Sequence, residues 1–191
     1  MSDAWAAGAE LTAILITVPE LAEYTERWRS VSRSTARPQV PLTELIPPHV
    51  TVLVPWVAEP TDTDLARLQA AVASIEPFEL SFPTAGQFPN GTAWLKPEPF
   101  DKVRSILLSV FDAFPECPPY GGEFPDPHPH LTISSSAQGG PAVVAEANAA
   151  LAAAPAPTVL LTELELWRED AEGVWHQLGA VPLGSAPNGR R

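Results

Sequence analysis

Two short segments of the sequence place a threonine two residues after a histidine. Residues 49–52 read His-Val-Thr-Val and residues 130–133 read His-Leu-Thr-Ile, and a proline precedes each histidine. Side chains two positions apart in a strand project from the same face, so each segment would present an imidazole beside a hydroxyl. Imidazole exchanges protons near neutral pH, and a hydroxyl can donate a hydrogen bond to a phosphate oxygen. The chemistry that this pairing suits is hydrolysis of a phosphodiester.

In this interpretation His49 and His130 form an acid–base pair, and Thr51 and Thr132 bind the phosphate. A neutral histidine would take a proton from the attacking water, and a protonated one would give a proton to the leaving oxygen. The threonines would stabilise the non-bridging oxygens as charge builds on them. This scheme requires no metal and no cofactor. The order of the two histidines stays open, because the two segments are alike.

Three alternatives remain open for these histidines. His128 lies two residues before His130, so the two could bind a metal ion in a metal-dependent hydrolase. The preferred interpretation of His128 is an exposed loop residue at the mouth of the site. The same pocket could instead hold a nucleotide or a phosphorylated metabolite without turnover. The histidines could also be ordinary, partly buried side chains with satisfied hydrogen bonds.

The two segments belong to a longer internal repeat. Trp94 follows His49 by 45 residues, and Trp175 follows His130 by the same interval. Each half, about 48–96 and 129–182, has the pattern of a β-α-β-β unit. A duplication of this kind predicts two similar lobes related by an approximate two-fold axis. The two histidine strands would lie near that axis, and a ligand would bind between the lobes.

Apolar periodicity places the other elements along the chain. The helices expected cover residues 21–32, 61–75, 100–114 and 142–153, and the strands cover 11–18, 48–56, 78–82, 92–96, 130–135, 159–167 and 174–181. The loop over 115–129 is rich in proline. We therefore predict an α+β fold with mainly antiparallel sheets facing a central cleft. It would form a single bilobal domain over residues 1–183, with a mobile C-terminal tail over 184–191.

The amino-acid composition limits which molecules the protein can bind. The 191 residues carry a formal charge of −12, which argues against long RNA but permits a small anionic ligand in a pocket. A single cysteine excludes an internal disulfide and fits a reducing compartment. We see neither a signal peptide nor an apolar run long enough to span a membrane. The expectation is a cytoplasmic, monomeric protein that does not bind membranes.

The two His-x-Thr-x segments resemble the motif of the 2H phosphoesterase superfamily, which includes bacterial RNA 2′,3′-cyclic phosphodiesterases, also called 2′-5′ RNA ligases. The resemblance extends over about residues 11–183, and residues 114–133 are similar to those of a compact bacterial branch. It implies a bilobal, duplicated LigT-like fold. It also implies metal-independent hydrolysis of a 2′,3′-cyclic phosphate or another 2′-linked phosphodiester. Because the chain is acidic, we expect a small nucleotide-like substrate rather than an RNA ligase activity.

Further side chains are candidates for contact with such a substrate. Lys96 shares a strand face with Trp94, whereas the corresponding residue of the second half is Gln177. A lysine that binds phosphate would therefore lie on one side only, so the two lobes would bind different parts of the ligand. Aromatic side chains near the expected rim could stack on a base, and these are Trp56, Phe88, Tyr120 and Phe124.

Overall fold

The computed structural model describes residues 11–36, 46–123, 126, 128–135 and 139–184, with the side chains of the first helix described only as far as Arg29. The strands are β1 (Thr12–Thr17), β2 (His49–Leu53), β3 (Phe78–Gln87), β4 (Ala93–Glu98), β5 (Leu131–Ser134), β6 (Val159–Leu161), β7 (Glu163–Glu169) and β8 (Trp175–Pro182). The helices are α1 (Ala22–Ala36), α2 (Asp62–Val72), α3 (Phe100–Ala113) and α4 (Pro141–Ala153), with 3₁₀ turns η2 (Pro19–Leu21) and η4 (Pro119–Gly122). The tail predicted over 184–191 lies, beyond Gly184, outside the described residues.

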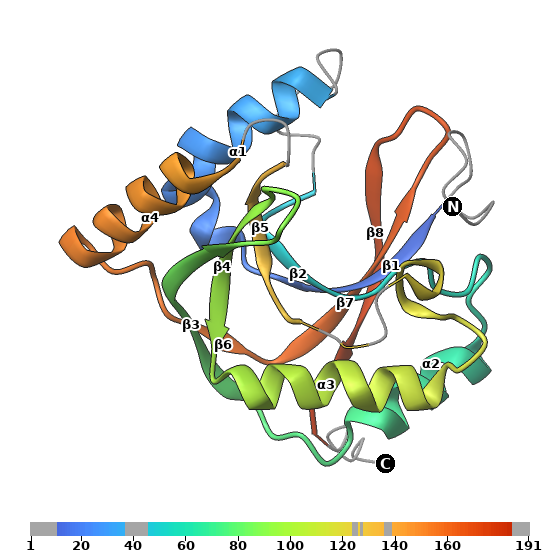
Figure 1. Ribbon diagram of the computed structural model, residues 1–191. Coiled ribbons are helices and arrows are strands. Elements are labelled where there is room, and N and C mark those ends of the chain that lie inside the picture. Colours follow the sequence, from blue (N-terminus) through green and yellow to red (C-terminus); the bar gives the residue numbers. More distant parts are fainter. Residues whose placement is uncertain (1–10, 37–45, 124–125, 127, 136–138, 185–191) are drawn as a thin grey trace.

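The strands form one curled sheet in the order β6-β3-β4-β5-β2-β1-β7-β8 (Figure 1). All neighbouring strands in it are antiparallel. This confirms the predicted α+β class. The expected halves are joined into one continuous sheet, because β2 and β5, the two histidine strands, pair with each other at its centre.

The strand expected over 159–167 is divided in the structure. Its first part, β6, pairs with β3, whereas its second part, β7, pairs with β1 near the other end of the sheet. Only Thr162 separates the two strands. The ends of the sheet must therefore lie close together, and the sheet curls into a half-barrel.

The strand order shows how the two halves are combined. The chain contains two series of elements in the same order, which are β1, α1, β2, α2, β3 and then β4, α3, β5, α4, β7. In the second series the short strand β6 precedes β7. In both series the first strand pairs with the histidine strand, β1 with β2 and β4 with β5. The third strand crosses to the other series, since β3 pairs with β4 and β7 pairs with β1. Each half therefore contributes strands to the surroundings of the other half's histidine.

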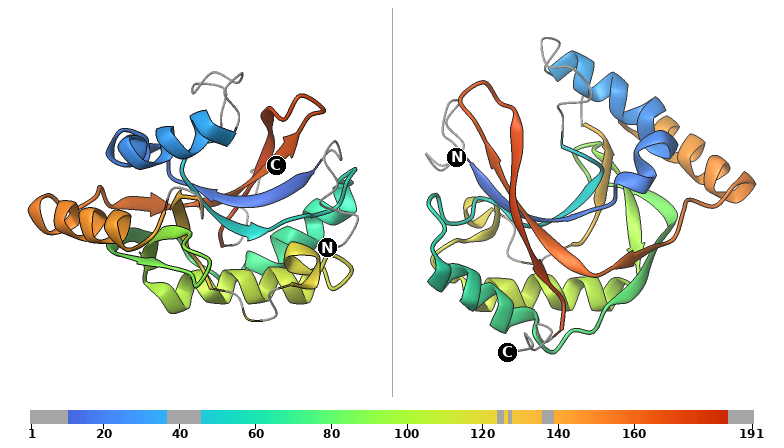
Figure 2. Two further views of the ribbon diagram at one scale, coloured as in Figure 1. Left: turned by 45° about the horizontal axis from the view of Figure 1, so that its top comes forward. Right: turned by 180° about the vertical axis from the view of Figure 1, so that it is seen from behind.

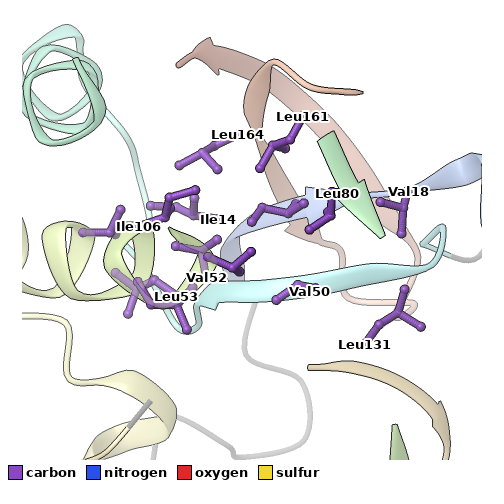
Figure 3. Close-up of a cluster of buried hydrophobic side chains, with 14 of the residues drawn as sticks. Ile14, Val18, Val50, Val52, Leu53, Leu80, Ile106, Leu131, Leu161 and Leu164 are labelled. Atoms are coloured by element: carbon purple, nitrogen blue, oxygen red, sulfur yellow. The ribbon is translucent and has the colours of Figure 1, made fainter. Parts of the chain in front are cut away.

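One face of the sheet is covered by helices. Val50, Val52 and Leu131 point to this face and pack, almost fully buried, in one cluster with Ile106 of α3 (Figure 3). Burial of these apolar side chains is the main driving force that holds the helices on the sheet. Because side chains alternate along a strand, the histidines and threonines of β2 and β5 must project from the opposite face.

The helices lie in two pairs on the outside of the curl, α1 with α4 and α2 with α3 (Figure 2). A hydrogen bond from the Tyr24 hydroxyl to the Ala154 carbonyl, 3.0 Å long, links the first pair. At the start of α2, a capping box between Thr61 and Asp64 satisfies backbone groups that the helix leaves unpaired. Within the described ranges, none of these helices is long and apolar enough to cross a membrane.

Candidate active site

Both histidine rings are oriented by the same kind of local hydrogen bond. Nδ1 of His49 lies 2.8 Å from the Pro47 carbonyl oxygen, and Nδ1 of His130 lies 2.7 Å from the His128 carbonyl oxygen. A carbonyl oxygen only accepts hydrogen bonds, so Nδ1 must carry the hydrogen in each ring. In a neutral ring the lone pair is then on Nε2. Each histidine is therefore fixed in the tautomer in which Nε2 can accept a proton.

The strand register places each histidine opposite the threonine of the other segment. Val50 of β2 is paired with Leu131 of β5 in an antiparallel register. One residue further in each direction, Thr51 lies opposite His130 and His49 lies opposite Thr132. Directly opposed side chains in such a pair have Cβ atoms about 4.5–5.5 Å apart. The two imidazoles and two hydroxyls therefore form a small square on the concave face of the sheet.

Two cavities lie beside these residues, and the larger also reaches Val52, Leu107 and Phe111 on the side of the sheet that α3 covers. The larger, of about 580 Å³, is lined by His130, and the smaller, of about 330 Å³, is lined by His49. Thr51 and Tyr120 line both cavities. The two histidines thus face neighbouring compartments that meet at these two hydroxyl-bearing side chains.

Aromatic rings surround His130 in the larger cavity. The Phe88 ring meets the His130 ring edge to face, with centroids 4.8 Å apart. His128 lies against Phe88, Trp94 and Phe100, with centroids 5.0–5.5 Å apart. Burial lowers the pKa of His130 below its ordinary value of 6.5, and the nearby His128 lowers it further, while the hydrogen bond to the His128 carbonyl opposes the shift. His130 therefore favours the neutral form at pH 7.

The Trp94 indole depends on a glycine in the neighbouring strand. Gly86 of β3 is paired with Trp94 of β4, and a methyl group at Gly86 would overlap the indole ring. Glycine thus provides the space in which the ring lies flat across the sheet. We call Phe88, Trp94, Phe100 and His128 the aromatic wall; Phe88 and His128 line the larger cavity, and Trp94 and Phe100 pack against His128.

The smaller cavity has a different lining. Leu15 of β1 is paired with Thr51, and its side chain and that of Ala13 are almost fully buried there. Trp175 of β8 and Glu169 of β7 complete this side, and the Glu169 side chain is only 8% exposed. Each tryptophan of the repeat therefore lies nearer to the histidine that it does not follow at the 45-residue interval. Trp94 of the first half lies near His130, and Trp175 of the second half lies near His49.

The remaining candidates are distributed as follows. Thr132 is exposed and paired with Trp94 of β4. Lys96 forms an ion pair of 2.6 Å with Glu98 and lies over the Phe100 ring, behind the aromatic wall. Phe88 lines the larger cavity, and Tyr120 lines both cavities.

The expectation for Trp56 was wrong, because this ring is buried against Phe114 in the core. Phe124 lies outside the described residues. His128 is exposed and lines the larger cavity, as predicted for a residue at the mouth of the site. Its ring centroid is 6.4 Å from that of His130. Among the described residues, no cluster of three His, Cys, Asp or Glu side chains with the geometry of a metal site occurs.

Several residues of the site could not be assigned from local spacing. Phe100 was expected only to begin a helix, and Glu169 lies beyond the strand expected over 159–167, yet Phe100 packs against His128 and Glu169 lines the smaller cavity. The repeat gave a usable signal for Trp94 and Trp175, because both follow a histidine by the same interval.

Comparisons with known proteins identify the family and the fold of the chain. The family model of the 2′-5′ RNA ligase superfamily matches residues 17–173. No curated protein matches the chain. Among solved structures, E. coli LigT complexed with NADP+ is 16% identical with a TM-score of 0.55, over 92% of this chain and 98% of the other.

Two further structures give the same result. E. coli LigT complexed with 3′-AMP is 18% identical with a TM-score of 0.54, over 91% of this chain and 98% of the other. A structure described as a phosphoesterase is 17% identical with a TM-score of 0.55, over 92% and 98%. At these identities the similarity is one of fold, whereas the family model spans most of the sequence. The chain belongs to the 2′-5′ RNA ligase superfamily.

Proposed function

We propose that the protein is a phosphodiesterase that hydrolyses a 2′,3′-cyclic phosphate, or another 2′-linked phosphodiester, of a small nucleotide-like substrate. The observation that carries this proposal is the matched orientation of His49 and His130, whose Nδ1 atoms both donate to the carbonyl two residues before. Two imidazoles with proton-exchanging Nε2 atoms, beside two hydroxyls, supply an acid, a base and phosphate ligands.

His130 is the better candidate for the base, because burial favours its neutral form. In the proposed step, Nε2 of His130 takes a proton from water as the water oxygen forms a bond to phosphorus. The bond from phosphorus to one ribose oxygen breaks, and protonated His49 gives its Nε2 proton to that oxygen. The cyclic diester and water thus become a monoester with a free hydroxyl. Thr51 and Thr132 hydrogen-bond the non-bridging oxygens as charge builds on them.

The aromatic wall supports a nucleotide-like substrate. A cavity of about 580 Å³ falls in the size range of small-molecule sites. Asn90 and Thr92 at its edge add polar groups to a mostly apolar lining. A nucleobase, with its flat apolar faces and polar edge, fits such a lining. The net charge of −12 favours a small substrate over long RNA, and hydrolysis over ligation of RNA.

Hydrolysis of the four 2′,3′-cyclic nucleotides in excess EDTA tests the proposal. We expect turnover by the wild type, and no turnover by the His49→Ala/His130→Ala double variant. His176→Ala is the matched control, since this exposed histidine pairs with Asp170 on the β7–β8 hairpin. Tight binding of the nucleotides without turnover would favour a binding module. Activity that requires a divalent ion would favour the metal-dependent alternative with His128 and His130.

A further inference from the structure

Tyr120 occupies the boundary between the two cavities. It belongs to η4, in the loop between α3 and β5, and its backbone N–H donates a hydrogen bond of 2.7 Å to the Val54 carbonyl just beyond β2. Its ring packs against the cluster of Ala13, Leu15 and Val54 on the concave face. The side chain lines both the His49 and the His130 compartments. A loop residue is thus fixed across the middle of the site.

The backbone at Tyr120 is held in an unfavourable conformation. Its φ and ψ angles of 50° and 35° lie in the left-handed region, which bulky side chains rarely adopt. Gly121 and Gly122 continue the loop with positive φ angles of 66° and 87°. A strained residue of this kind persists only where its surroundings over-determine it, and such residues cluster at functional sites. At Tyr120 the left-handed backbone conformation accompanies the packing of the ring against Ala13, Leu15 and Val54.

The Tyr120 hydroxyl shares a hydrogen bond with the Thr51 hydroxyl. Burial raises the pKa of Tyr120 above 10, although this hydrogen bond opposes the shift. The phenol therefore keeps its proton across the range in which the histidines exchange theirs. Tyr120 and Thr51 together present two neutral hydroxyls at the meeting point of the cavities.

A phosphate between the two histidines must approach this pair of hydroxyls. Thr51 lies opposite His130 on the neighbouring strand and two residues from His49 on its own. A phosphorus atom within reach of both imidazoles is therefore near the Thr51 hydroxyl. In a 2′,3′-cyclic phosphate both ester oxygens belong to one ribose, so the nucleoside would lie on one side of the Tyr120 ring, in the larger cavity.

We propose that Tyr120 is a positioning and selectivity residue of the phosphodiesterase site. Its hydroxyl holds the Thr51 side chain beside the phosphate, and its ring separates the two compartments so that the nucleoside of the substrate stays in the larger one. The proposal rests on the proposed function for its kinetic test, while its placement of the phosphate can be tested without turnover.

The hydroxyl is tested with Tyr120→Phe, which keeps the ring. We expect kcat on 2′,3′-cyclic nucleotides to fall about tenfold with KM within twofold, because the lost hydrogen bond acts mainly on a group that stabilises the transition state. In a Thr51→Val background the same change should have no further effect. The matched control is Tyr24→Phe, because Tyr24 is the other tyrosine of the chain and bonds to α4. A wild-type kcat in Tyr120→Phe, or an equal loss in both backgrounds, would overturn this role.

The ring is tested by comparing Tyr120→Phe with Tyr120→Ala. The alanine variant joins the two cavities, so we expect the ratio of kcat/KM between the best and the worst cyclic nucleotide to shrink toward one. In Tyr120→Phe the ratio should stay within twofold of wild type. Equal ratios in the phenylalanine and alanine variants would show that the ring does not separate the compartments.

A spectroscopic experiment separates this inference from the proposed function. Protein labelled with 3-fluorotyrosine has two fluorine sites, and Tyr24→Phe assigns their resonances. Titration with inorganic phosphate should shift the Tyr120 resonance and leave that of Tyr24 in place. A shift without turnover of any cyclic nucleotide would refute the proposed function but keep the phosphate at Tyr120. Turnover with an unmoved Tyr120 resonance and a wild-type rate in Tyr120→Phe would refute the role of Tyr120 alone.

Discussion

Around His130 the cavity is crowded with aromatic rings, whereas around His49 it is lined by aliphatic side chains, Trp175 and a buried carboxylate. The local geometry is nevertheless the same, since a carbonyl two residues earlier orients each imidazole. The comparison teaches that two levels of structure act on these histidines. The short sequence segment sets the tautomer of each ring, and residues distant in sequence line the cavity beside it.

The different surroundings arise from the exchange of strands between the halves. The loop between β3 and β4 lines the cavity beside the second histidine, while Glu169 of β7 and Trp175 of β8 line the cavity beside the first. The residues that differ between the lobes are therefore on segments remote in sequence from the histidine they affect. The two halves share the orientation of the histidine ring and differ in the residues that surround it.

Removal of either imidazole should have the largest effect. We expect His49→Ala and His130→Ala each to lower kcat by about 10²–10⁴-fold, the usual worth of a positioned acid or base. The double variant should lose much less than the product of the two factors, because the pair acts as a unit. Initial rates with 2′,3′-cyclic nucleotides measure this, with His176→Ala within twofold of wild type as control. A loss below tenfold at both positions would remove the pair from the mechanism.

Removal of a threonine hydroxyl should follow in size. Thr51→Val keeps the shape of the side chain and loses a hydrogen-bond donor to the phosphate, so we expect kcat to fall about 10²-fold. Thr132→Val should act in the same direction from the other side of the square. The serine variants keep the hydroxyl and should retain most of the activity. Equal kcat values in the valine and serine variants would contradict a phosphate contact.

A single ring of the aromatic wall can be removed by mutation. Phe88→Ala exposes the His130 ring to water, so the pKa of His130 should rise toward 6.5, and the acidic limb of kcat/KM should move to higher pH. Loss of a stacking partner should also raise KM by about tenfold, from about 1–3 kcal/mol per stacked base. Trp175→Ala is the matched change in the other cavity, and the acidic limb should stay in place there. The same displacement in both variants would refute the difference between the cavities.

The smallest expected effect is on stability, and it comes from Gly86, which lies against the Trp94 ring of the aromatic wall. Gly86→Ala places a methyl group against the Trp94 indole, and we expect it to lower the free energy of unfolding by about 1–3 kcal/mol, as overpacking does. Gly179→Ala is the control on β8, where no atom lies within 4 Å of the added carbon. Denaturant unfolding of both variants measures the difference. Equal stabilities would show that the indole moves away from Gly86 at no cost.

Much of the fold follows from local patterns in the sequence. The strand with Val50 and Val52 and the helix with Val103, Ile106 and Val110 bury the side chains that periodicity predicts. The repeat places the two histidine strands together, which the structure confirms. The exchange of β3 and β7 between the halves could not be predicted, because strand pairing depends on contacts between segments far apart in the sequence. The division of residues 159–167 has the same cause.

The candidate site likewise combines features that the local sequence predicts with contacts between distant segments, which it does not predict. The spacing of the histidines and threonines was enough to predict their shared face, because alternation along a strand is a local property. The hydrogen bonds of both Nδ1 atoms were not predicted, since they depend on how the backbone turns at Pro47 and His128. The contact between Tyr120 and Thr51 joins segments 69 residues apart in the chain. Only the folded structure brings such groups together.

The central claim is that His130 acts as the base and His49 as the acid, and the pH dependence of kcat/KM in excess EDTA tests it most directly. The account predicts a bell-shaped profile for the wild type, with the acidic limb below pH 6.5 from His130. His130→Ala should lose that limb and keep the basic one, and His49→Ala should lose the basic limb. A wild-type profile with a single limb, or loss of the same limb in both variants, would contradict the account.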